Sequence, residues 1–433
     1  MSNLRATQTG TGWDVDDTKS GPVSAELDGN GRPTGRMLTD DGQVVGGAVR
    51  SLTNVYGRKH LGAAVATAGT SVHQMRSYVP FGGMLVDVAL EIYSGSTSGA
   101  ATLNAYAIAG SDDYDAVPTS WTVGSDTPSI AEDAARVVNV PARAQTAWVR
   151  LYLPPDVNDP RWSTLFTRAR FTSGWAFGIG GAVPSEWDSN VGAYRQRLDY
   201  NTLANINDAW PGTPSGSDVQ FRSHSILIRP VSAIAARTIA ISGDSRSTGV
   251  GDLNDFYGWA CRAAEQITTN GAALVGFESW SVRATPSSEF EARLNTLLRA
   301  RAVDLVHWQP ASSNNTDPWA SSTVDTCIAQ TARIAQECAR RGIAFSTETM
   351  YPSGAADTVA KAAQWQRLND HIRATYPNNF IDFERTALTD RSGAVPVLSA
   401  AYHPVGDPLH RNVSGHELSR DLAVPLWTRL LGL

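Results

Sequence analysis

The chain has 433 residues, of which 42% are hydrophobic and 18% are charged, a composition typical of folded globular proteins. Its formal net charge of -6 argues against a nucleic-acid partner, and its apolar runs fall short of the ~18 residues that a membrane-spanning helix needs. A chain of this length exceeds what one hydrophobic core usually organises, so two or more domains are predicted.

Residues 1–50 are rich in Gly, Asp, Thr and Ser and show little periodicity. This pattern predicts turns, an extended arm or a small β-rich cap. The first residues, MSNLRATQTGTGWDVDD, have neither the basic start nor the apolar core of a signal peptide. We therefore expect a cytoplasmic protein, or one that is released from the cell as part of a particle.

Residues 51–230 contain short alternating runs such as MLVDVALEIYSG, AWVRLYLP and SHSILIRP, separated by Gly, Pro, Asp and Ser. Alternation at these spacings predicts an all-β sandwich of jelly-roll type. Pro230 and the following VSAIAA mark the expected junction with the next domain. A carbohydrate-binding role for this domain is a hypothesis from architecture alone.

Residues 231–433 alternate five strand-like runs with helical runs. This order predicts a three-layer α/β/α domain around a five-stranded parallel sheet. Ser414 with Glu417 three residues later predicts a capping box at the start of the last helix. The other predicted helices lie near 254–269, 286–301, 320–341 and 356–375.

Ser245 directly follows the first of these strands, TIAIS, in the stretch SGDSRSTG. Ligands of open α/β sheets bind at the carboxyl ends of the strands, so a serine placed there is a candidate nucleophile. The alternative is a strand-ending turn in which Asp244 or Ser245 caps the next helix.

Asp407 and His410 stand three residues apart in a loop before the last helix. A serine hydroxyl needs a base to remove its proton, and that base needs a third group to orient it, so this pair can complete a triad with Ser245. His403, Asp407 and His410 could instead bind a metal, but no fourth ligand is spaced to match. Neither a metal nor another cofactor is therefore predicted.

The segments GDSRSTG (243–249) and DPLHRNVSG (407–415) resemble the first and last sequence blocks of the SGNH, or GDSL-type, hydrolases. The resemblance covers about residues 237–433 and implies a flavodoxin-like fold. It also implies that Ser245 is the nucleophile, His410 the general base and then acid, and Asp407 its orienting partner.

The same resemblance implies an oxyanion hole formed by the backbone N–H groups of Ser245 and Ala284 and by the side-chain amide of Asn314. The family has glycine where Ala284 and Ser312 stand, so these two loops depart from its pattern. Asn315 is an alternative donor, and Asn314 could instead form an Asx-turn in a polar loop.

Several other residues have two readings. Trp280, Trp308 and Trp319 could wall a sugar or acyl pocket or pack in the core, and the sequence does not choose between these. The scattered spacing of Cys261, Cys327 and Cys338 favours buried thiols on helices over disulfides. His416 is expected to be exposed in the first turn of the last helix.

These features lead to two functional hypotheses. The first is a serine esterase that removes a small acyl group, such as acetyl, from a carbohydrate or related polar substrate. The alternative is a phage tail component or other glycan-binding particle protein with a hydrolase-like domain, which stable trimers in solution would favour.

Overall fold

The computed structural model describes the chain from residue 54 onward with gaps, and five short strands before that residue. Within 54–433 the residues left out are 61–62, 68–71, 95–100, 125, 127, 131–141, 179–195, 202, 211–220, 223, 253–256, 272, 301–302 and 353–357.

The C-terminal half contains the five parallel strands that the sequence predicts. They are β19 (Ala236–Ser242), β20 (Leu274–Ser279), β21 (Leu305–Trp308), β22 (Ala344–Glu348) and β23 (Phe380–Ile381). Their order across the sheet is β20-β19-β21-β22-β23, and each neighbouring pair is parallel. This is the flavodoxin-like order, in which the switch point beside the first strand is where ligands bind.

Helices alternate with these strands, as predicted. They are α1 (Ser245–Thr248), α2 (Trp259–Thr269), α3 (Ser287–Ala300), α4 (Ser321–Arg340), α5 (Val359–Thr375) and α6 (Val413–Leu431), with a 3-10 turn at Ala400–Tyr402. Helices α3, α4 and α5 lie within a few residues of their predicted positions. Helix α2 begins at Trp259, later than predicted, and its N-cap is Gly258.

The predicted capping box at Ser414 is wrong. The N-cap of α6 is Asn412, whose side-chain oxygen accepts a hydrogen bond of 3.0 Å from the Gly415 N–H. Asn412 lies two residues earlier than the predicted cap and already satisfies an N–H of the first turn. Ser414 therefore lies inside the helix, where its Glu417 partner is not needed to begin it.

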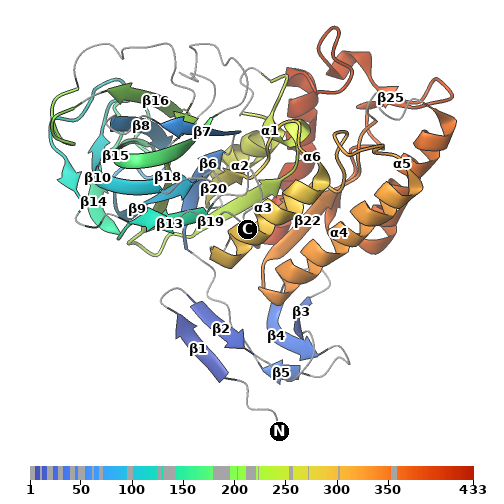
Figure 1. Cartoon of the computed structure of the whole chain (residues 1–433), viewed down its shortest axis with the longest axis horizontal. Coiled ribbons are helices and arrows are strands. Elements are labelled where there is room, and N and C mark those ends of the chain that lie inside the picture. The colour runs from blue at the N-terminus through green and yellow to red at the C-terminus, as the bar shows by residue number, and fades with distance from the viewer. Residues whose placement is uncertain are drawn as a thin grey trace.

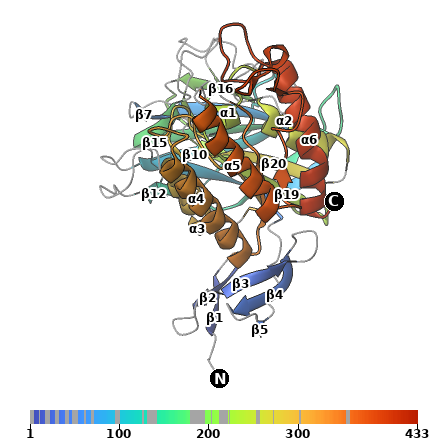
Figure 2. The same ribbon diagram turned by 90° about the vertical axis from the view of Figure 1, so that its right-hand side faces the viewer.

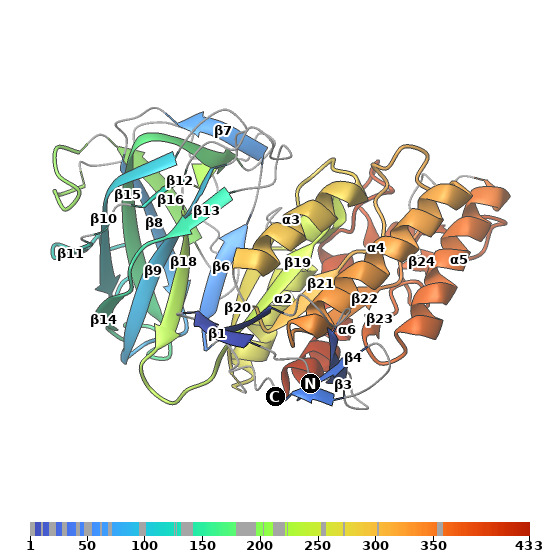
Figure 3. The ribbon, with the colours of Figure 1, turned by 60° about the horizontal axis from the view of Figure 1, so that its bottom comes forward.

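Alternate side chains of β19 build the cores on the two faces of the sheet. Ile239 and Ile241 pack in one cluster with α2 and α6, whereas Ala240 packs in another with α3 and α4. Figure 3 shows α3 and α4 in front of the sheet. The three-layer arrangement thus follows from a strand that is apolar on both sides.

The N-terminal half is built of strands that are mostly antiparallel. From residue 54 they are β6 (Tyr56–His60), β7 (Ala63–Thr67), β8 (Val72–Val79), β9 (Met84–Ser94), β10 (Ala101–Ser111), β11 (Thr122–Val123), β12 (Ser129–Ile130), β13 (Ala142–Gln145), β14 (Val149–Leu153), β15 (Ser163–Gly178), β16 (Gln196–Asn201), β17 (Phe221–Arg222) and β18 (His224–Pro230). Side chains of β8, β10 and β15 from one sheet and of β9 and β18 from another share one apolar cluster.

Further strands lie outside the two large sheets. Before residue 54 they are β1 (Arg5–Thr9), β2 (Gly12–Asp16), β3 (Val23–Leu27), β4 (Pro33–Thr39) and β5 (Val44–Gly46), which lie together at the bottom of Figure 2. The pair β24 (Thr389–Asp390) and β25 (Val397–Leu398) precedes α6.

Strand β6 joins the two halves into one sheet. It pairs antiparallel with β18 and parallel with β20, so a ten-stranded sheet runs through both (Figure 1). Beside it, the Thr238 hydroxyl donates to the Val55 carbonyl at 2.6 Å and accepts from the Gly57 N–H at 3.1 Å. The change near residue 230, from short strand-like runs to alternating strands and helices, therefore falls between β18 and β19. The sheet itself is continuous across this point.

Among the described residues, no helix combines the length and the apolar composition that crossing a bilayer requires.

The junction between β6 and β20 gives a test of this shared sheet. A Cβ added at Gly276 would lie 2.5 Å from the Gly57 N and O atoms, so Gly276→Ala forces the two strands apart. We expect the free energy of unfolding to fall by about 1–3 kcal/mol, measured by thermal melting. Gly393→Ala is the control, because its nearest contact would be 3.6 Å away. An unchanged melting temperature for Gly276→Ala would contradict the tight pairing.

Candidate active site

The nucleophile candidate Ser245 is held in a short helical turn at the end of β19. Asp244 is the N-cap of α1, and its carboxylate accepts a hydrogen bond of 3.0 Å from the Arg246 N–H. Gly243 is needed beneath this turn, since an added Cβ would lie 2.4 Å from the Ser247 hydroxyl oxygen. The capping role that the sequence offered as an alternative therefore belongs to Asp244, and the same cap places Ser245 as the first helical residue.

The loop before α6 pairs Asp407 with His410. One carboxylate oxygen of Asp407 lies 2.7 Å from His410 Nδ1, and the other accepts from the backbone N–H groups of Leu409 and His410 at 3.0 and 3.2 Å. Burial alone would raise the pKa of Asp407, but the hydrogen bonds from His410 and from the Leu409 N–H outweigh it and hold that pKa below its usual range. An ionised carboxylate only accepts hydrogen bonds, so the His410 ring carries its proton on Nδ1.

The structure brings the two loops together. His410 Nε2 lies 2.8 Å from Ser245 Oγ, although the residues are 165 positions apart in the chain. With Nδ1 protonated, Nε2 has a free lone pair and can accept a hydrogen bond from the Ser245 hydroxyl. Ser245 is only 8% exposed, so the residue is largely shielded from solvent.

Ala284 adopts the backbone conformation that favours glycine. Its φ angle is 55°, in the left-handed region, where the resemblance to SGNH hydrolases implies a glycine. No described residue accepts a hydrogen bond from the Ala284 N–H, and the Ser245 N–H is the first of α1 and has no partner within that helix. Both N–H groups thus remain available as donors.

Arg293 of α3 supports the loop that carries Ala284. It is fully buried, and it donates to the Trp280 carbonyl at 3.0 Å and to the Thr285 hydroxyl at 3.0 Å. Burial lowers the pKa of Arg293 to about 10, so the side chain remains charged at neutral pH. A charged donor that holds both ends of the loop can offset the strain at Ala284.

The third loop carries Asn314 and Asn315. The Asn314 amide nitrogen donates to the Ser312 hydroxyl at 3.1 Å and to the Thr285 carbonyl at 3.4 Å. Asn315 instead accepts from the Ser287 N–H at 2.8 Å and so fixes the start of α3. The Asn314 amide already donates twice, so one of these contacts must open before it can donate to a substrate.

Ser312, which stands where the family has glycine, ties this loop to the nucleophile loop. Its hydroxyl oxygen lies 2.8 Å from the Asp244 carboxylate and 2.9 Å from the Thr285 carbonyl. The hydroxyl is fully buried and touches all three loops, those after β19, β20 and β21. Sequence reasoning treated this residue as a departure from a pattern and missed its bridging role.

His416 is buried, and the expectation that it is exposed is wrong. Its Nδ1 accepts from the Trp259 N–H and its Nε2 donates to the Val250 carbonyl, each at 3.1 Å. The ring therefore fastens the start of α6 to the segment that follows α1. Burial, with a further contribution from Arg411, lowers the pKa of His416 to about 3.

Other candidates are placed in the core or apart from the triad. Trp280, Trp308 and Trp319 are each at most 1% exposed, which decides their two readings in favour of core packing. The three cysteines are free and buried, as expected. His403 Nδ1 lies 2.8 Å from the Pro404 carbonyl. Among the described residues, no group of three or more His, Cys, Asp or Glu side chains is arranged to hold a metal ion.

No family model and no curated protein matches the chain. Among solved structures, it is similar to a lipase/acylhydrolase from Enterococcus faecalis, with 18% identity and a TM-score of 0.35 over 45% of this chain and 95% of the other. It is also similar to the esterase EstA from Pseudoalteromonas sp. (16% identity, TM-score 0.35, 46% and 100% covered). A GDSL-like lipase from Bacteroides thetaiotaomicron matches with 17% identity and a TM-score of 0.34, over 43% and 85%.

These structures belong to the hydrolase type that the two sequence motifs resemble. Each covers less than half of this chain, and at these identities and TM-scores the similarity carries no argument about chemistry. The chemistry rests instead on the contacts among Ser245, His410 and Asp407.

The strained backbone at Ala284 leads to a prediction about side-chain size. Ala284→Gly removes the left-handed penalty of about 1–2 kcal/mol but adds flexibility to the unfolded chain, so we expect stability close to that of the unmodified protein. Ala284→Val adds a branched side chain at a φ of 55° and should lower the melting temperature clearly. Equal melting temperatures for the two variants would contradict the left-handed conformation.

The buried His416 ring predicts a pH dependence of stability. The unfolded chain binds a proton at His416 below about pH 6.5, whereas the folded chain stays neutral down to about 3. Stability therefore falls as the pH is lowered through this window, by up to ~1.4 kcal/mol per pH unit for this residue. Urea midpoints for His416→Asn should show a shallower fall between pH 6 and about pH 4. The control His371→Asn, on α5, should keep most of the original slope.

Proposed function

We propose that this protein is a serine esterase that acts through an acyl-enzyme. The observation that carries the proposal is the unbroken contact chain from Asp407 through His410 to Ser245, with distances of 2.7 and 2.8 Å. A base within hydrogen-bond reach of a hydroxyl, and itself oriented by a carboxylate, is the arrangement that activates a serine.

In the proposed first step, Ser245 Oγ attacks the ester carbonyl carbon and its proton passes to His410 Nε2. The carbonyl oxygen becomes an oxyanion, and Asp407 stabilises the imidazolium that forms. Collapse of this intermediate breaks the ester bond, and His410 returns the proton to the leaving alcohol. Water then attacks the acyl-enzyme by the same route and releases the acid and free Ser245.

The oxyanion is proposed to be held by the backbone N–H groups of Ser245 and Ala284 and by the Asn314 amide. The supporting observations are the Ser245 N–H, which has no partner within α1, and the left-handed φ at Ala284. Each such donor is worth about 3–4 kcal/mol in barrier height when it points at the developing charge.

The proposed substrate is a small acyl ester, such as an acetyl ester, on a carbohydrate. We propose that residues 51–230 form a jelly-roll-like sandwich that binds the glycan; the apolar cluster shared by side chains of two sheets supports this arrangement. The buried positions of Trp280, Trp308 and Trp319 do not support a sugar-stacking role for those rings. No observation on the described residues favours the alternative of a particle protein.

The nucleophile is tested with Ser245→Ala. We expect turnover of 4-nitrophenyl acetate to fall by roughly 10⁴-fold, because the attacking oxygen is lost. The matched control is Ser322→Ala on the exposed first turn of α4, which should keep full turnover.

Labelling with a fluorophosphonate probe, followed by peptide mapping, locates the reactive serine directly. Modification at Ser245 alone supports the proposal. Full turnover in Ser245→Ala, or labelling at another serine, would overturn it. Acetate release from an acetylated polysaccharide, compared with hydrolysis of longer acyl esters, then tests the proposed substrate.

A further inference from the structure

Each of the two reacting residues is followed in the chain by a buried arginine. Arg246 follows Ser245 and is 3% exposed, and Arg411 follows His410 and is 1% exposed. Arginine is almost never fully buried without partners, so two such residues next to the reacting groups call for an explanation. Proton transfer between Ser245 and His410 uses neither of them.

Both arginines converge on one ring, that of Tyr351. The guanidinium carbon of Arg411 lies 4.2 Å from the ring centroid, and that of Arg246 lies 5.4 Å from it. Tyr351 is fully buried, and its hydroxyl donates to the Leu409 carbonyl at 3.2 Å. Tyr351 thus touches the loop that carries His410 on both sides of the histidine, and the residue next to Ser245.

The two arginines have different contacts besides the Tyr351 ring. Arg246 Nε lies 3.6 Å from the Asp244 carboxylate, and Arg411 packs over Phe383 at 4.3 Å. Among the described residues, none of the guanidinium nitrogens of Arg411 has a hydrogen-bond partner. The face of an aromatic ring attracts a desolvated cation, so the rings of Tyr351 and Phe383 are the main stabilising contacts of Arg411.

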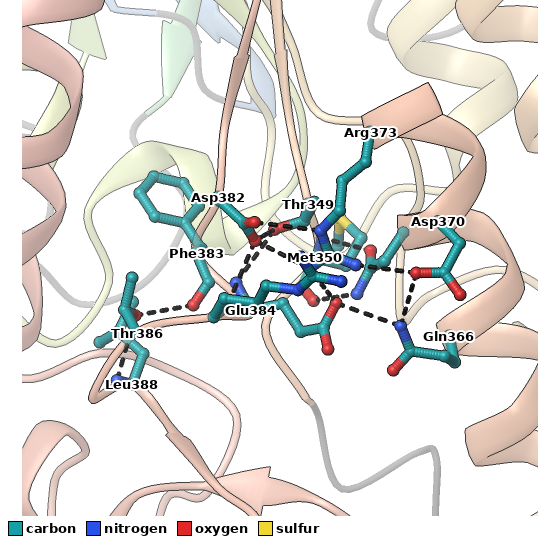
Figure 4. Close-up of polar contacts among 12 residues, drawn as sticks. Thr349, Met350, Gln366, Asp370, Arg373, Asp382, Phe383, Glu384, Thr386 and Leu388 are labelled. Atoms are coloured by element: carbon teal, nitrogen blue, oxygen red, sulfur yellow. Dashed lines mark hydrogen bonds and ion pairs between the residues drawn. The ribbon is translucent and has the colours of Figure 1, made fainter. Parts of the chain in front are cut away.

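The two residues that precede Tyr351 are held in place by hydrogen bonds. The preceding residue, Met350, donates its N–H to Asn369 at 2.8 Å, and its carbonyl accepts from Asn369 and Trp365 of α5, each at 2.9 Å. Thr349 donates to Asp382 at 2.9 Å, and its hydroxyl accepts from the Glu384 N–H at 3.0 Å. Figure 4 shows the contacts of Thr349, Asp382 and Glu384, in which Asp382 and Glu384 also bind Arg373. These hydrogen bonds restrain the backbone that leads into Tyr351 and so restrain the position of its ring.

We propose that Tyr351 is a positioning residue that holds His410 at hydrogen-bond distance from Ser245, through the Leu409 carbonyl and the side chains of Arg246 and Arg411. This inference rests on the proposed esterase function and deepens it. Because the Tyr351 ring contacts the neighbours of both reacting residues, a shift of either loop must break a contact with it. Burial raises the pKa of Tyr351 to about 12, so the phenol keeps the proton that it donates.

The test separates the hydroxyl from the ring. Tyr351→Phe keeps the surface that both cations face and removes only the bond to Leu409, so we expect kcat for 4-nitrophenyl acetate to fall about tenfold with KM within about twofold. Tyr351→Leu also removes the ring, and kcat should fall roughly 100-fold. Tyr376→Phe is the matched control: its ring packs against Phe345, with centroids 5.4 Å apart, and its kcat should not change.

A double-mutant cycle distinguishes positioning from a general structural role. If Tyr351 acts through the triad, Tyr351→Phe should cause no further loss of the residual activity in a Ser245→Ala background. Full kcat in the single variant Tyr351→Phe would overturn the proposal, and so would an equal factor of loss in both backgrounds. These outcomes differ from failure of the proposed function, in which Ser245→Ala itself would remain active.

Discussion

The chemistry proposed for this protein depends on one contact, the 2.8 Å approach of His410 Nε2 to Ser245 Oγ. Hydrogen bonds form over a range of only about half an ångström in donor–acceptor distance, whereas the two residues that form this one are 165 positions apart in the chain. Something must therefore hold both loops to a common frame. The parallel sheet provides that frame, because β19 delivers Ser245 at its carboxyl end, beside the switch point in strand order.

Buried hydrogen bonds hold the segments around that contact together. Ser312 links the Asp244 carboxylate to the loop after β20, and His416 links α6 to the segment after α1. The backbone at Gly251 also packs tightly against the loop that carries His410. A Cβ added at Gly251 would lie 2.1 Å from the Arg411 carbonyl oxygen, so this packing requires glycine. Such networks specify a single arrangement, because breaking one member leaves a buried polar group without a partner.

The N-terminal half is joined to the C-terminal half through a shared sheet and a shared apolar cluster. Strand β6 pairs parallel with β20 on one side and antiparallel with β18 on the other. The two halves are therefore joined by backbone hydrogen bonds. Tyr78, Tyr114 and Trp162 of the β-rich half also lie in the apolar cluster that contains α2 and α6. A substitution that shifts strands or core side chains in one half can therefore change the packing of the other.

The sequence by itself determined the alternation of strands and helices, the parallel sheet, and the three residues brought together as a candidate triad, because periodicity and short motifs are local properties. It misplaced the start of α6 and the exposure of His416, and it left the three tryptophans undecided. Only the tertiary structure decided those points, along with the bridging role of β6 and the convergence of Arg246 and Arg411 on Tyr351. Burial and long-range pairing depend on which distant segments meet, and no local pattern records that.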